Sequence, residues 1–473
     1  MKKTKIICTL GPASSDPAVL ERMINSGMNI ARLNFSHGSY EEHAHRISLV
    51  RQAAAKAGKP VGILADLQGP KIRIGQLSVE PLVLNDGDRV YLTVNQEQGR
   101  ASGYIYVDYP TLIEDVSLRG EIFLADGMIE LKIIEIGETA LQCEVISGGE
   151  LTSKKGVTLP GVSVNLPALM EKDRSDLKFI IKEQVDLIAL SFARKAEHIL
   201  EIRELVNNLG GDQLLIAKIE NEEGLKNSEE ILQAADGIMV ARGDLGVEVP
   251  PEEVPLIQKH LIEICNIAGK PVITATEMME SMIRNPRPTR AEITDVAHAI
   301  MDGTDAIMLS GETAVGKFPV AVVHIMSRAA ERIEASLKYE EILAKKRVGS
   351  FPTVADAISH ATCQTAMDLK AAAIITSTQS GSTARMVSKY RSPAPIVAVT
   401  PSERTFQQLT ISWGVNPVLA PPAQNIDDLF DLSVEGAKKA GFVKDNDLIV
   451  LTAGVRTGVP GSTNLLQVLT VEE

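Results

Sequence analysis

The sequence has few cysteines and no excess of positive charge. Both features narrow the range of functions that the protein can have. Its four cysteines, Cys8, Cys143, Cys265 and Cys363, lack the spacing of a zinc site or a disulfide framework. This usage fits a reducing compartment, so we expect a cytoplasmic protein. The formal net charge of −13 leaves no basic footprint for nucleic acid. Small anions remain possible ligands, since local clusters of cations can hold them in an acidic protein.

Long apolar runs are also missing. No stretch is long enough to span a bilayer, and the short apolar run after Lys5 lacks the core of a signal peptide. We therefore expect no membrane partner. The chain does have 473 residues of globular composition, 44% hydrophobic and 23% charged. That length predicts about two to four domains.

The first part of the chain alternates between strand and helix patterns. Lys5 to Leu10 is rich in strand-forming residues. Asp16 and Pro17 are typical of a helix start, and Gly27 is typical of a helix end. Met28 to Leu33 is the next predicted strand. A strand, helix and strand in this order indicate a parallel sheet.

The same unit recurs until eight strands have been predicted. Eight strand-and-helix units predict an α/β fold of the TIM (β/α)8 barrel type, in which catalytic groups lie at the carboxyl ends of the strands. The six further strands are predicted at Val61–Leu64, Asp186–Leu190, Leu214–Ile219, Gly237–Val240, Pro271–Ala275 and Ala306–Leu309.

Polar residues follow nearly every predicted strand. Ordinary loop chemistry could explain any one of these ends, but a shared site explains the whole set better. The polar ends are Arg32–His37, Asp66, Ser191–Lys195, Lys218 with Glu220, Asp244, Thr274 with Thr276, and Ser310 with Glu312.

One strand end carries a cation and an anion together. Because alternate side chains of a strand share a face, Lys218 and Glu220 are predicted to point the same way. Carboxylate oxygens suit a divalent metal, and Asp244 supplies a second carboxylate after the next strand. Glu220 and Asp244 are therefore our candidate metal pair. The alternative for Lys218 and Glu220 is a surface ion pair, worth about 0–1 kcal/mol.

The segment between Asp66 and a helix predicted near Lys172 breaks the rhythm of the barrel. It has short strand patterns separated by Gly, Asp and Asn turns. An insertion in the third strand-to-helix loop lies on the catalytic face, so we predict a lid. The alternative is an insertion remote from the chemistry. The predicted strands are Arg89–Val94, Tyr104–Asp108, Glu121–Leu124, Ile129–Ile136 and Leu141–Ile146.

A separate α/β domain is predicted from Phe351 onward, after a linker at Ala344–Ser350. The loop Thr378-Gln379-Ser380-Gly381-Ser382-Thr383 precedes a helix, and Gly454–Ser462, with Arg456, is a second glycine-rich loop. Together they suggest a site for a phosphorylated effector. An ordinary capped helix is equally consistent with these residues. The domain's strands are predicted at Ala372–Thr376, Pro395–Val399, Pro417–Ala420 and Leu448–Thr452.

Seven motifs match one known family in the right order along the chain. They are Arg32–Gly38, Gly69–Arg73, Lys154–Val157, Lys218–Asn221, Met239–Gly246, Ile273–Met278 and Asn285–Glu292. Over nearly its whole length, the sequence thus resembles the pyruvate kinase family. The resemblance implies transfer of a phosphoryl group from phosphoenolpyruvate to ADP, the last step of glycolysis. It also implies a homotetramer of chains with a barrel (1–72 and 167–343), an inserted small β-barrel lid (73–166) and a C-terminal effector domain (351–473).

The resemblance implies a role for each residue of the substrate site. Glu220 and Asp244 would hold Mg²⁺, although such ligands also accept Mn²⁺. Lys218 would stabilise the moving phosphoryl group and Arg32 would hold the substrate phosphate. The backbone around Ala241 and Gly243, with Asp244, would bind the substrate carboxylate.

Proton delivery and nucleotide binding are also implied. Thr276 would lie beside the enolate carbon, but its hydroxyl is too weak an acid to act alone. We expect water, or a relay through Ser310 or Glu312, to carry the proton. The implied nucleotide contacts are Asn34, His37, Arg73 and Lys155.

The chain departs from the commoner pattern of the family at Lys71, where many members have glutamate and need potassium. In those members the ion is held at positions matching Asn34, Ser36, Asp66 and the carbonyl of the next residue, which is Leu67 here. We predict that Lys71 supplies the missing positive charge and that K⁺ is not required. The alternative is that Lys71 points to solvent and a potassium site remains.

Two other functions are compatible with parts of the sequence. A magnesium-dependent lyase or aldolase acting on oxoacids would share the paired carboxylates, but would not need Lys218, a lid or a C-terminal domain. A non-catalytic sensor of sugar phosphates would tolerate damage to the catalytic set. Arg32, Lys218, Glu220 and Thr276 are all present, which argues against the sensor.

Overall fold

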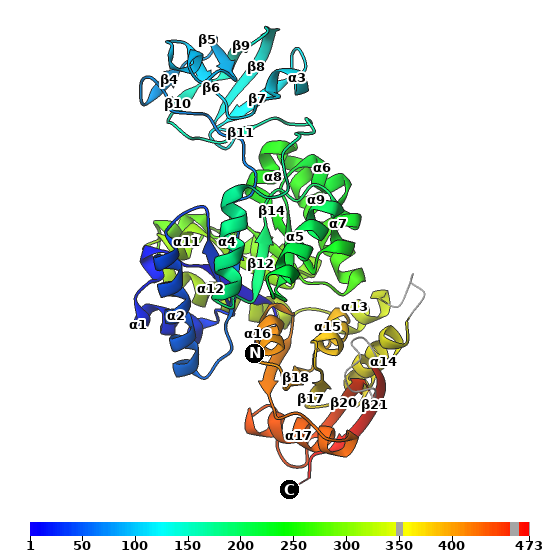
Figure 1. Ribbon diagram of the computed structural model, residues 1–473. Helices are drawn as coiled ribbons and strands as arrows, with labels where there is room; N and C mark the ends of the chain where they lie inside the picture. Colours follow the sequence, from blue (N-terminus) through cyan, green and yellow to red (C-terminus); the bar gives the residue numbers. More distant parts are fainter. Residues whose placement is uncertain (347–352, 455–462, 473) are drawn as a thin grey trace.

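The protein consists of three parts stacked along one axis (Figure 1). The computed structural model describes residues 1–346, 353–454 and 463–472. A β-rich lid stands at one end, a barrel wrapped in helices lies in the middle, and an α/β unit lies at the other end, next to the chain's N-terminus. In the residues described, no helix combines the length and apolar character needed to cross a membrane.

The middle part is a closed barrel of eight parallel strands, as the sequence predicted. Its order is β1-β16-β15-β14-β13-β12-β3-β2, and the register pairs Asn34 with Asp66 at the carboxyl ends of β2 and β3. The strands are β1 (Lys5–Thr9), β2 (Ile30–Asn34), β3 (Gly62–Asp66), β12 (Leu187–Leu190), β13 (Leu214–Ile219), β14 (Gly237–Ala241), β15 (Val272–Ala275) and β16 (Ala306–Leu309).

Local sequence explains where the surrounding helices begin and end. The Asp16 carboxylate accepts hydrogen bonds from the N–H groups of Ala18 and Val19, and Gly27 ends α1 with a positive φ of 123°. The helices of the barrel are α1 (Pro17–Ser26), α2 (Tyr40–Ala57), α4 (Glu171–Lys182), α5 (Ala196–Asn208), α6 (Glu222–Lys226), α7 (Ser228–Ala234), α8 (Arg242–Glu248), α9 (Val254–Ala268), α10 (Arg290–Asp302), α11 (Gly311–Ala314) and α12 (Pro319–Glu334).

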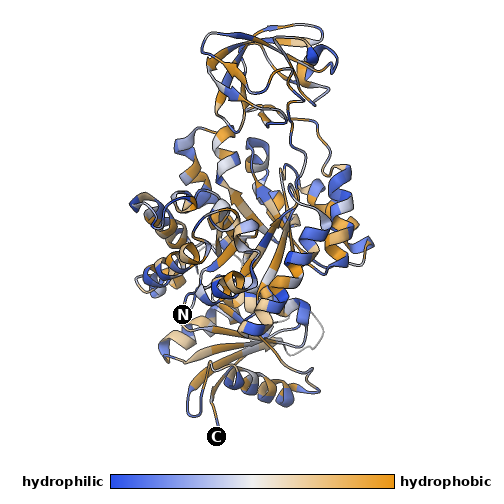
Figure 2. Ribbon diagram, turned by 90° about the vertical axis from the view of Figure 1, so that its left-hand side faces the viewer, coloured by the Kyte–Doolittle hydropathy of each residue, from blue (hydrophilic) through white to orange (hydrophobic). Residues whose placement is uncertain are grey.

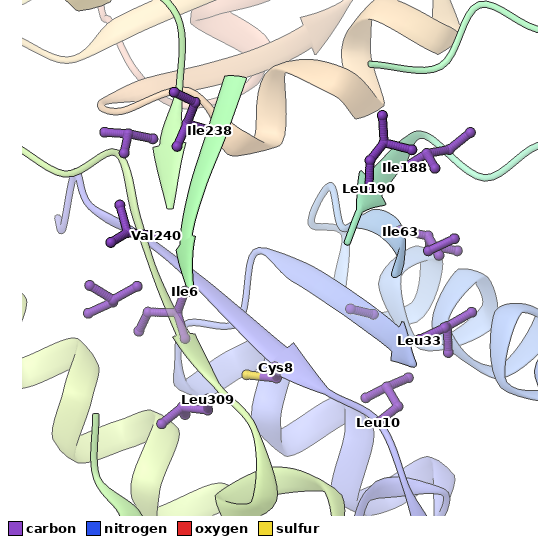
Figure 3. Packing of buried hydrophobic residues seen from close by; sticks show 14 of the residues in the cluster. Ile6, Cys8, Leu10, Leu33, Ile63, Ile188, Leu190, Ile238, Val240 and Leu309 are labelled. Atoms are coloured by element: carbon purple, nitrogen blue, oxygen red, sulfur yellow. The ribbon is translucent and has the colours of Figure 1, made fainter. Parts of the chain in front are cut away.

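Alternation along the strands divides the barrel's core into two layers. Figure 3 shows part of the outer layer, where Ile6 and Cys8 of β1 join side chains from other strands, and this layer packs against the helices. The inner layer includes Ile7 from β1 and Ile216 from β13. Because Lys218 and Glu220 follow Ile216 at steps of two, they belong to the inner face at the carboxyl end of the barrel.

The inserted lid follows β3 and consists of two sheets. Six strands pair in the order β11-β7-β8-β9-β5-β6, and β10 pairs with β4. Among the sheets of the described chain, only the eight-stranded barrel is closed. The elements are β4 (Leu82–Leu84), β5 (Arg89–Thr93), β6 (Tyr104–Tyr106), α3 (Leu112–Asp115), β7 (Glu121–Leu124), β8 (Ile129–Ile136), β9 (Ala140–Ser147), β10 (Gly149–Leu151) and β11 (Val157–Thr158).

The C-terminal part is a five-stranded sheet of order β19-β18-β17-β20-β21 with helices beside it. Figure 2 shows its strands as mainly hydrophobic, whereas its helices carry hydrophilic stretches. Strand β21 pairs antiparallel with β20 and was not predicted. The elements are α14 (Val354–Asp368), β17 (Ala373–Ser377), α15 (Ser382–Lys389), β18 (Ile396–Thr400), α16 (Glu403–Gln408), β19 (Val415–Leu419), α17 (Ile426–Lys439), β20 (Leu448–Gly454) and β21 (Thr463–Thr470).

The linker predicted at Ala344–Ser350 was wrong in its first three residues. Helix α13 (Tyr339–Lys346) extends through them, because Leu343 is buried against the C-terminal part and Lys346 donates to the side chain of Asn266. Residues 347–350 of the predicted linker lie outside the described residues.

The C-terminal part closes the amino-terminal end of the barrel. Ile411, in the short 3₁₀ helix Leu409–Ile411, is fully buried and belongs to the inner core layer of the barrel. A buried ion pair joins Arg391 to Asp305 at 2.9 Å. The opposite, carboxyl end of the barrel therefore remains for the lid and a functional site (Figure 1).

Candidate active site

Charged side chains from strands β2, β3 and β13 meet at the carboxyl end of the barrel. Arg32 on β2 makes two contacts with Asp66 Oδ2 on β3, from Nε at 2.8 Å and from Nη2 at 2.7 Å. Its Nη1 donates to the Thr9 hydroxyl at 2.8 Å. On the other side, Lys218 Nζ lies 3.2 Å from Asp66 Oδ1. Asp66 thus holds two cations close together.

Lys218 is almost fully buried and is held by oxygen atoms. Its Nζ lies 2.8 Å from Glu220 Oε1, so the two side chains do share a face, as the strand period predicted. Burial alone would lower the pKa of Lys218, but Asp66 and Glu220 outweigh burial and raise it above the usual lysine value. The pKa of Asp66 lies below its usual value, because Lys218 and Arg32 outweigh its burial. Lys218 and Asp66 are therefore both charged at neutral pH.

Glu220 and Asp244 fit a hard divalent cation. Burial, with added repulsion from Asp244, raises the pKa of Glu220 to about 7 despite the nearby Lys218. A buried carboxylate next to a partly exposed one, with oxygen donors only, suits Mg²⁺ or Mn²⁺. Within the residues described, no group of three or more His, Cys, Asp or Glu could enclose a metal. Substrate and water oxygens would therefore have to complete the coordination.

Lys71 lies against one of these carboxylates. Its Nζ is 3.3 Å from Asp244 Oδ1 and 3.0 Å from Asp126 Oδ1, which belongs to the lid. The Lys71 side chain is 22% exposed. Burial would lower its pKa, but Asp244 and Asp126 outweigh burial and raise it. Lys71 thus links the lid to the predicted metal pair and does not extend freely into solvent.

In the predicted monovalent-cation region, Asn34, Leu67 and Asp66 already have partners for their side-chain or carbonyl oxygens. Asn34 Oδ1 accepts from the Ser36 N–H at 3.1 Å. The Leu67 carbonyl accepts from the Ser191 hydroxyl at 2.8 Å. Both oxygens of Asp66 contact a cation. These oxygens are therefore already stabilised by contacts within the protein, without an added ion.

Thr276 occupies an unusual backbone conformation directly after β15. Its φ is +65° and that of Glu277 is +56°, a region that β-branched residues rarely adopt. The Thr276 hydroxyl accepts from the Gly243 N–H at 2.8 Å and donates to the Ala275 carbonyl at 2.7 Å. One N–H of the predicted carboxylate-binding backbone therefore already has a partner, and Ala241 precedes it as the last residue of β14.

The structure does not join Thr276 to the predicted proton relay. Glu312 is fully buried, and its carboxylate accepts from the N–H of Ser310 at 2.7 Å and of Met279 at 3.1 Å. Burial raises its pKa. Among the contacts of the described residues, none connects Thr276 with Ser310 or Glu312. Glu312 instead ties the loops after β15 and β16 together.

The predicted nucleotide residues belong to two parts of the protein, the lid and the barrel. Arg73 and Lys155 lie in adjacent backbone segments at the base of the lid, where Arg73 Nη1 donates to the Lys154 carbonyl and Ile74 N–H donates to the Lys155 carbonyl. His37 is exposed on the barrel side, after β2.

A pocket of about 230 Å³ lies between lid and barrel at this end. Its walls include Lys71 and Asp126 together with Glu220 and Asp244. Valines and leucines of the segment that returns from the lid complete one wall. The pocket is thus continuous with the predicted metal pair.

The predicted effector loop connects β17 to α15. Gly381 has a φ of +79° at the start of α15, and the Ser380 carbonyl accepts from Arg385 Nη2 at 3.0 Å. The Thr383 hydroxyl is buried and lies 2.8 Å from that of Thr463. Gln379, Ser380 and Ser382 are more open. Arg456 lies outside the described residues.

Sequence reasoning assigned no individual role to three supporting residues. Arg242 holds the Thr276 turn, because its Nη2 donates to the Thr276 carbonyl at 2.7 Å and its Nη1 pairs with Asp295 at 2.6 Å. Ser191 and Phe192 contact Lys218 and Glu220. Their place directly after a predicted strand was the available signal, but it did not separate them from the other polar strand ends.

Comparison with known proteins agrees with this geometry. Residues 1–323 match the family model of the pyruvate kinase barrel domain, and residues 356–469 match that of the pyruvate kinase alpha/beta domain. The chain is 50% identical to a pyruvate kinase of Geobacillus stearothermophilus, over all of this chain and 81% of that protein. It is 47% identical to a pyruvate kinase of Clostridium acetobutylicum over the full length of both.

Proposed function

The chain belongs to the pyruvate kinase family and is a phosphotransferase of that activity, and we propose that Lys71 lets it transfer the phosphoryl group without a bound potassium ion. Its substrates are accordingly phosphoenolpyruvate and ADP, with pyruvate and ATP as products. The observation that carries the proposal is the contact of Lys71 with Asp244 and Asp126.

Arg32 and Lys218 bind the phosphoryl group that is transferred. Phosphoryl transfer requires mainly positioning and stabilisation of spread negative charge. Asp66 holds the two cations at adjacent places on β2 and β13 before substrate arrives. They therefore need little reorganisation when charge develops on the phosphoryl oxygens.

Glu220 and Asp244 hold the divalent metal that the family requires, and we propose Mg²⁺. When bound, such an ion neutralises negative charge on the substrate oxygens. Ala241 and Gly243 supply the backbone that binds the substrate carboxylate. Binding there requires the Gly243 N–H to exchange its contact with the Thr276 hydroxyl for the substrate.

Lys71 supplies a fixed positive charge beside Asp244, in place of the monovalent ion that many members of the family need. The contacts of Asn34, Leu67 and Asp66 support this role, since their oxygens are already stabilised without an added ion. Because the ammonium also contacts Asp126, it links closure of the lid to the charge at Asp244.

The proton reaches the enolate next to Thr276. The Thr276 hydroxyl donates to a carbonyl of its own loop, so water is the better proton carrier than a direct relay through Glu312. Ser310, which is partly exposed, remains the candidate for holding that water.

The remaining assignments concern partners. Asn34, His37, Arg73 and Lys155 contact the nucleotide across the cleft between barrel and lid. A phosphorylated small molecule binds at Thr378–Thr383 and regulates the enzyme. The enzyme acts in the cytoplasm as a homotetramer.

Replacement of Lys218 tests the proposed chemistry. Lys218→Met keeps much of the side-chain volume but removes the charge, so kcat should fall by about 10²- to 10³-fold. Pyruvate formation from phosphoenolpyruvate and ADP is the measurement.

The control is Lys226→Met, which removes an exposed lysine of the same cleft that pairs with Glu222. It should stay within about twofold of the parent, since exposed ion pairs contribute little. A Lys218→Met enzyme with nearly full kcat would contradict the assignment of Lys218.

A further inference from the structure

Ser191 lies directly after β12, where three strands of the barrel come together. It is 8% exposed. Its Oγ lies 2.8 Å from Lys218 Nζ, 2.8 Å from the Leu67 carbonyl and 3.4 Å from Asp66 Oδ1. One hydroxyl therefore contacts the ends of both β3 and β13.

The direction of the Ser191 hydroxyl follows from its partners. A serine hydroxyl has one proton and two lone pairs, whereas an ammonium has three protons and no lone pair. Lys218 must donate, so a lone pair of the Ser191 hydroxyl faces Lys218. The Ser191 proton goes to the Leu67 carbonyl, which at 2.8 Å is nearer than Asp66 Oδ1 at 3.4 Å. The three N–H groups of Lys218 then match three acceptors, on Ser191, Asp66 and Glu220.

The next residue holds the neighbouring carboxylate. The Phe192 N–H donates to Glu220 Oε2 at 2.7 Å. Phe192 has a φ of +53°, which costs about 1–3 kcal/mol for a residue with a bulky side chain. Gly69 packs against the turn at Ser191 and Phe192, because a Cβ at Gly69 would lie 2.8 Å from Ser191 Cβ. The surrounding structure thus maintains a strained backbone that aims an N–H at Glu220.

We propose that Ser191 is a positioning residue for phosphoryl transfer, which with the Phe192 N–H fixes the ammonium of Lys218 relative to the carboxylate of Glu220. The turn at Ser191 and Phe192 thus positions both Lys218 and Glu220, although these two residues lie at the end of the adjacent strand, β13. Without the hydroxyl, Lys218 keeps Asp66 and Glu220 as partners but loses its third hydrogen-bond acceptor. The orientation of the ammonium is then less fixed. This inference rests on the proposed roles of Lys218 and Glu220.

Ser191→Ala is the direct test, measured as pyruvate formation over a range of phosphoenolpyruvate and Mg²⁺ concentrations. Groups that orient a functional side chain typically contribute 10- to 100-fold, so kcat should fall by that factor. The half-saturating Mg²⁺ concentration should stay unchanged, because the Phe192 N–H still holds Glu220. Ser191→Thr keeps Oγ and should recover most of the lost kcat.

The matched control is Ser388→Ala in the C-terminal part. Ser388 is also buried, and its hydroxyl donates to the Trp413 carbonyl at 2.7 Å. It should lose some thermal stability but keep kcat within about twofold, as expected of a structural hydroxyl. If Ser191→Ala does not fold, Ser191→Cys, whose sulfur is only a weak acceptor, should show an intermediate kcat.

Two results would overturn the inference. One is a Ser191→Ala enzyme with kcat within twofold of the parent. The other is a fall in kcat that Ser191→Thr does not recover. If Lys218→Met itself retained activity, the proposed function of Lys218 would fail first. An inactive Lys218→Met enzyme beside a fully active Ser191→Ala enzyme would reject the role of Ser191 alone.

Discussion

At the scale of single residues, the proposed role of Lys71 depends on the charge balance around Asp244. A lysine here adds a positive charge 3.3 Å from a predicted metal ligand. A glutamate would add a negative charge at the same place and would need a cation to balance it. We therefore expect the requirement for potassium to depend on this one side chain.

Lys71→Glu should create a need for potassium. We expect its rate without K⁺ to fall by about tenfold or more, because each 1.36 kcal/mol lost from transition-state stabilisation costs a factor of ten. Added K⁺ should restore part of the rate. Pyruvate formation in tetramethylammonium buffer, with and without K⁺, measures this. Lys226→Glu makes the same change of charge at the exposed rim of the cleft and should show no K⁺ response.

Simple periodicity predicted the central pair of the site but not its surroundings. A two-residue period placed Lys218 and Glu220 on one face, and the structure has them 2.8 Å apart. The strained turn at Thr276 and the contacts of Ser191 could not be predicted, since they depend on how loops after different strands pack. The lack of a contact between Glu312 and Thr276 could not be predicted for the same reason, since it depends on how the loops after β15 and β16 pack.

At the scale of elements, the pairing of β3 with β12 depends on a buried acid. Asp186, directly before β12, accepts from the Ile63 N–H of β3 at 2.8 Å and is 6% exposed. Burial raises its pKa to about 6, although the Ile63 N–H and Arg404 act in the opposite direction. The charged form is thus disfavoured in the folded protein.

Asp186→Asn should flatten part of the pH dependence of stability. An unfolded aspartate has a pKa near 3.9, so below about pH 6 the folded state binds a proton that the unfolded state does not. The free energy of unfolding of the parent should therefore rise as the pH falls from about 6 to about 4. Asparagine keeps an acceptor for the Ile63 N–H and removes this rise, which is at most roughly 3 kcal/mol.

Urea unfolding of both proteins between pH 4 and 7 measures the difference. Relative to the parent, Asp186→Asn should be most stable above pH 6 and lose this advantage toward pH 4. Parallel curves for the two proteins would show that Asp186 titrates normally.

Elements with strong local signals were predicted well. The eight barrel strands and the start of α1 at Asp16 and Pro17 follow from periodicity and capping. Strand β21 was missed, because its pairing with β20 is antiparallel and a sequence read as strand–helix units favours parallel neighbours. The last residues of helix α13 were predicted to be a linker, because the charged residues of this segment gave no sign that Leu343 is buried.

At the scale of the whole molecule, the C-terminal part completes the core of the barrel. Ile411 is fully buried among residues from the barrel strands, including Ile7 and Ile216. The barrel and the C-terminal part are therefore expected to lose stability together when this contact is weakened.

Ile411→Ala should lower the free energy of unfolding by about 2–5 kcal/mol, because it leaves a cavity at the end of the barrel. Leu419→Ala in the neighbouring strand is the control, since Leu419 is 45% exposed and should cost about 0.5 kcal/mol or less. Equal effects of the two substitutions in urea unfolding would show that Ile411 does not join the two parts energetically.

The most direct measurement is the rate of pyruvate formation from phosphoenolpyruvate and ADP, with Mg²⁺, in tetramethylammonium buffer with and without K⁺. If Lys71 replaces the monovalent ion, the protein is active in both buffers at nearly the same rate. A rate that depends on added K⁺ would contradict the role of Lys71, although the chain would remain a pyruvate kinase.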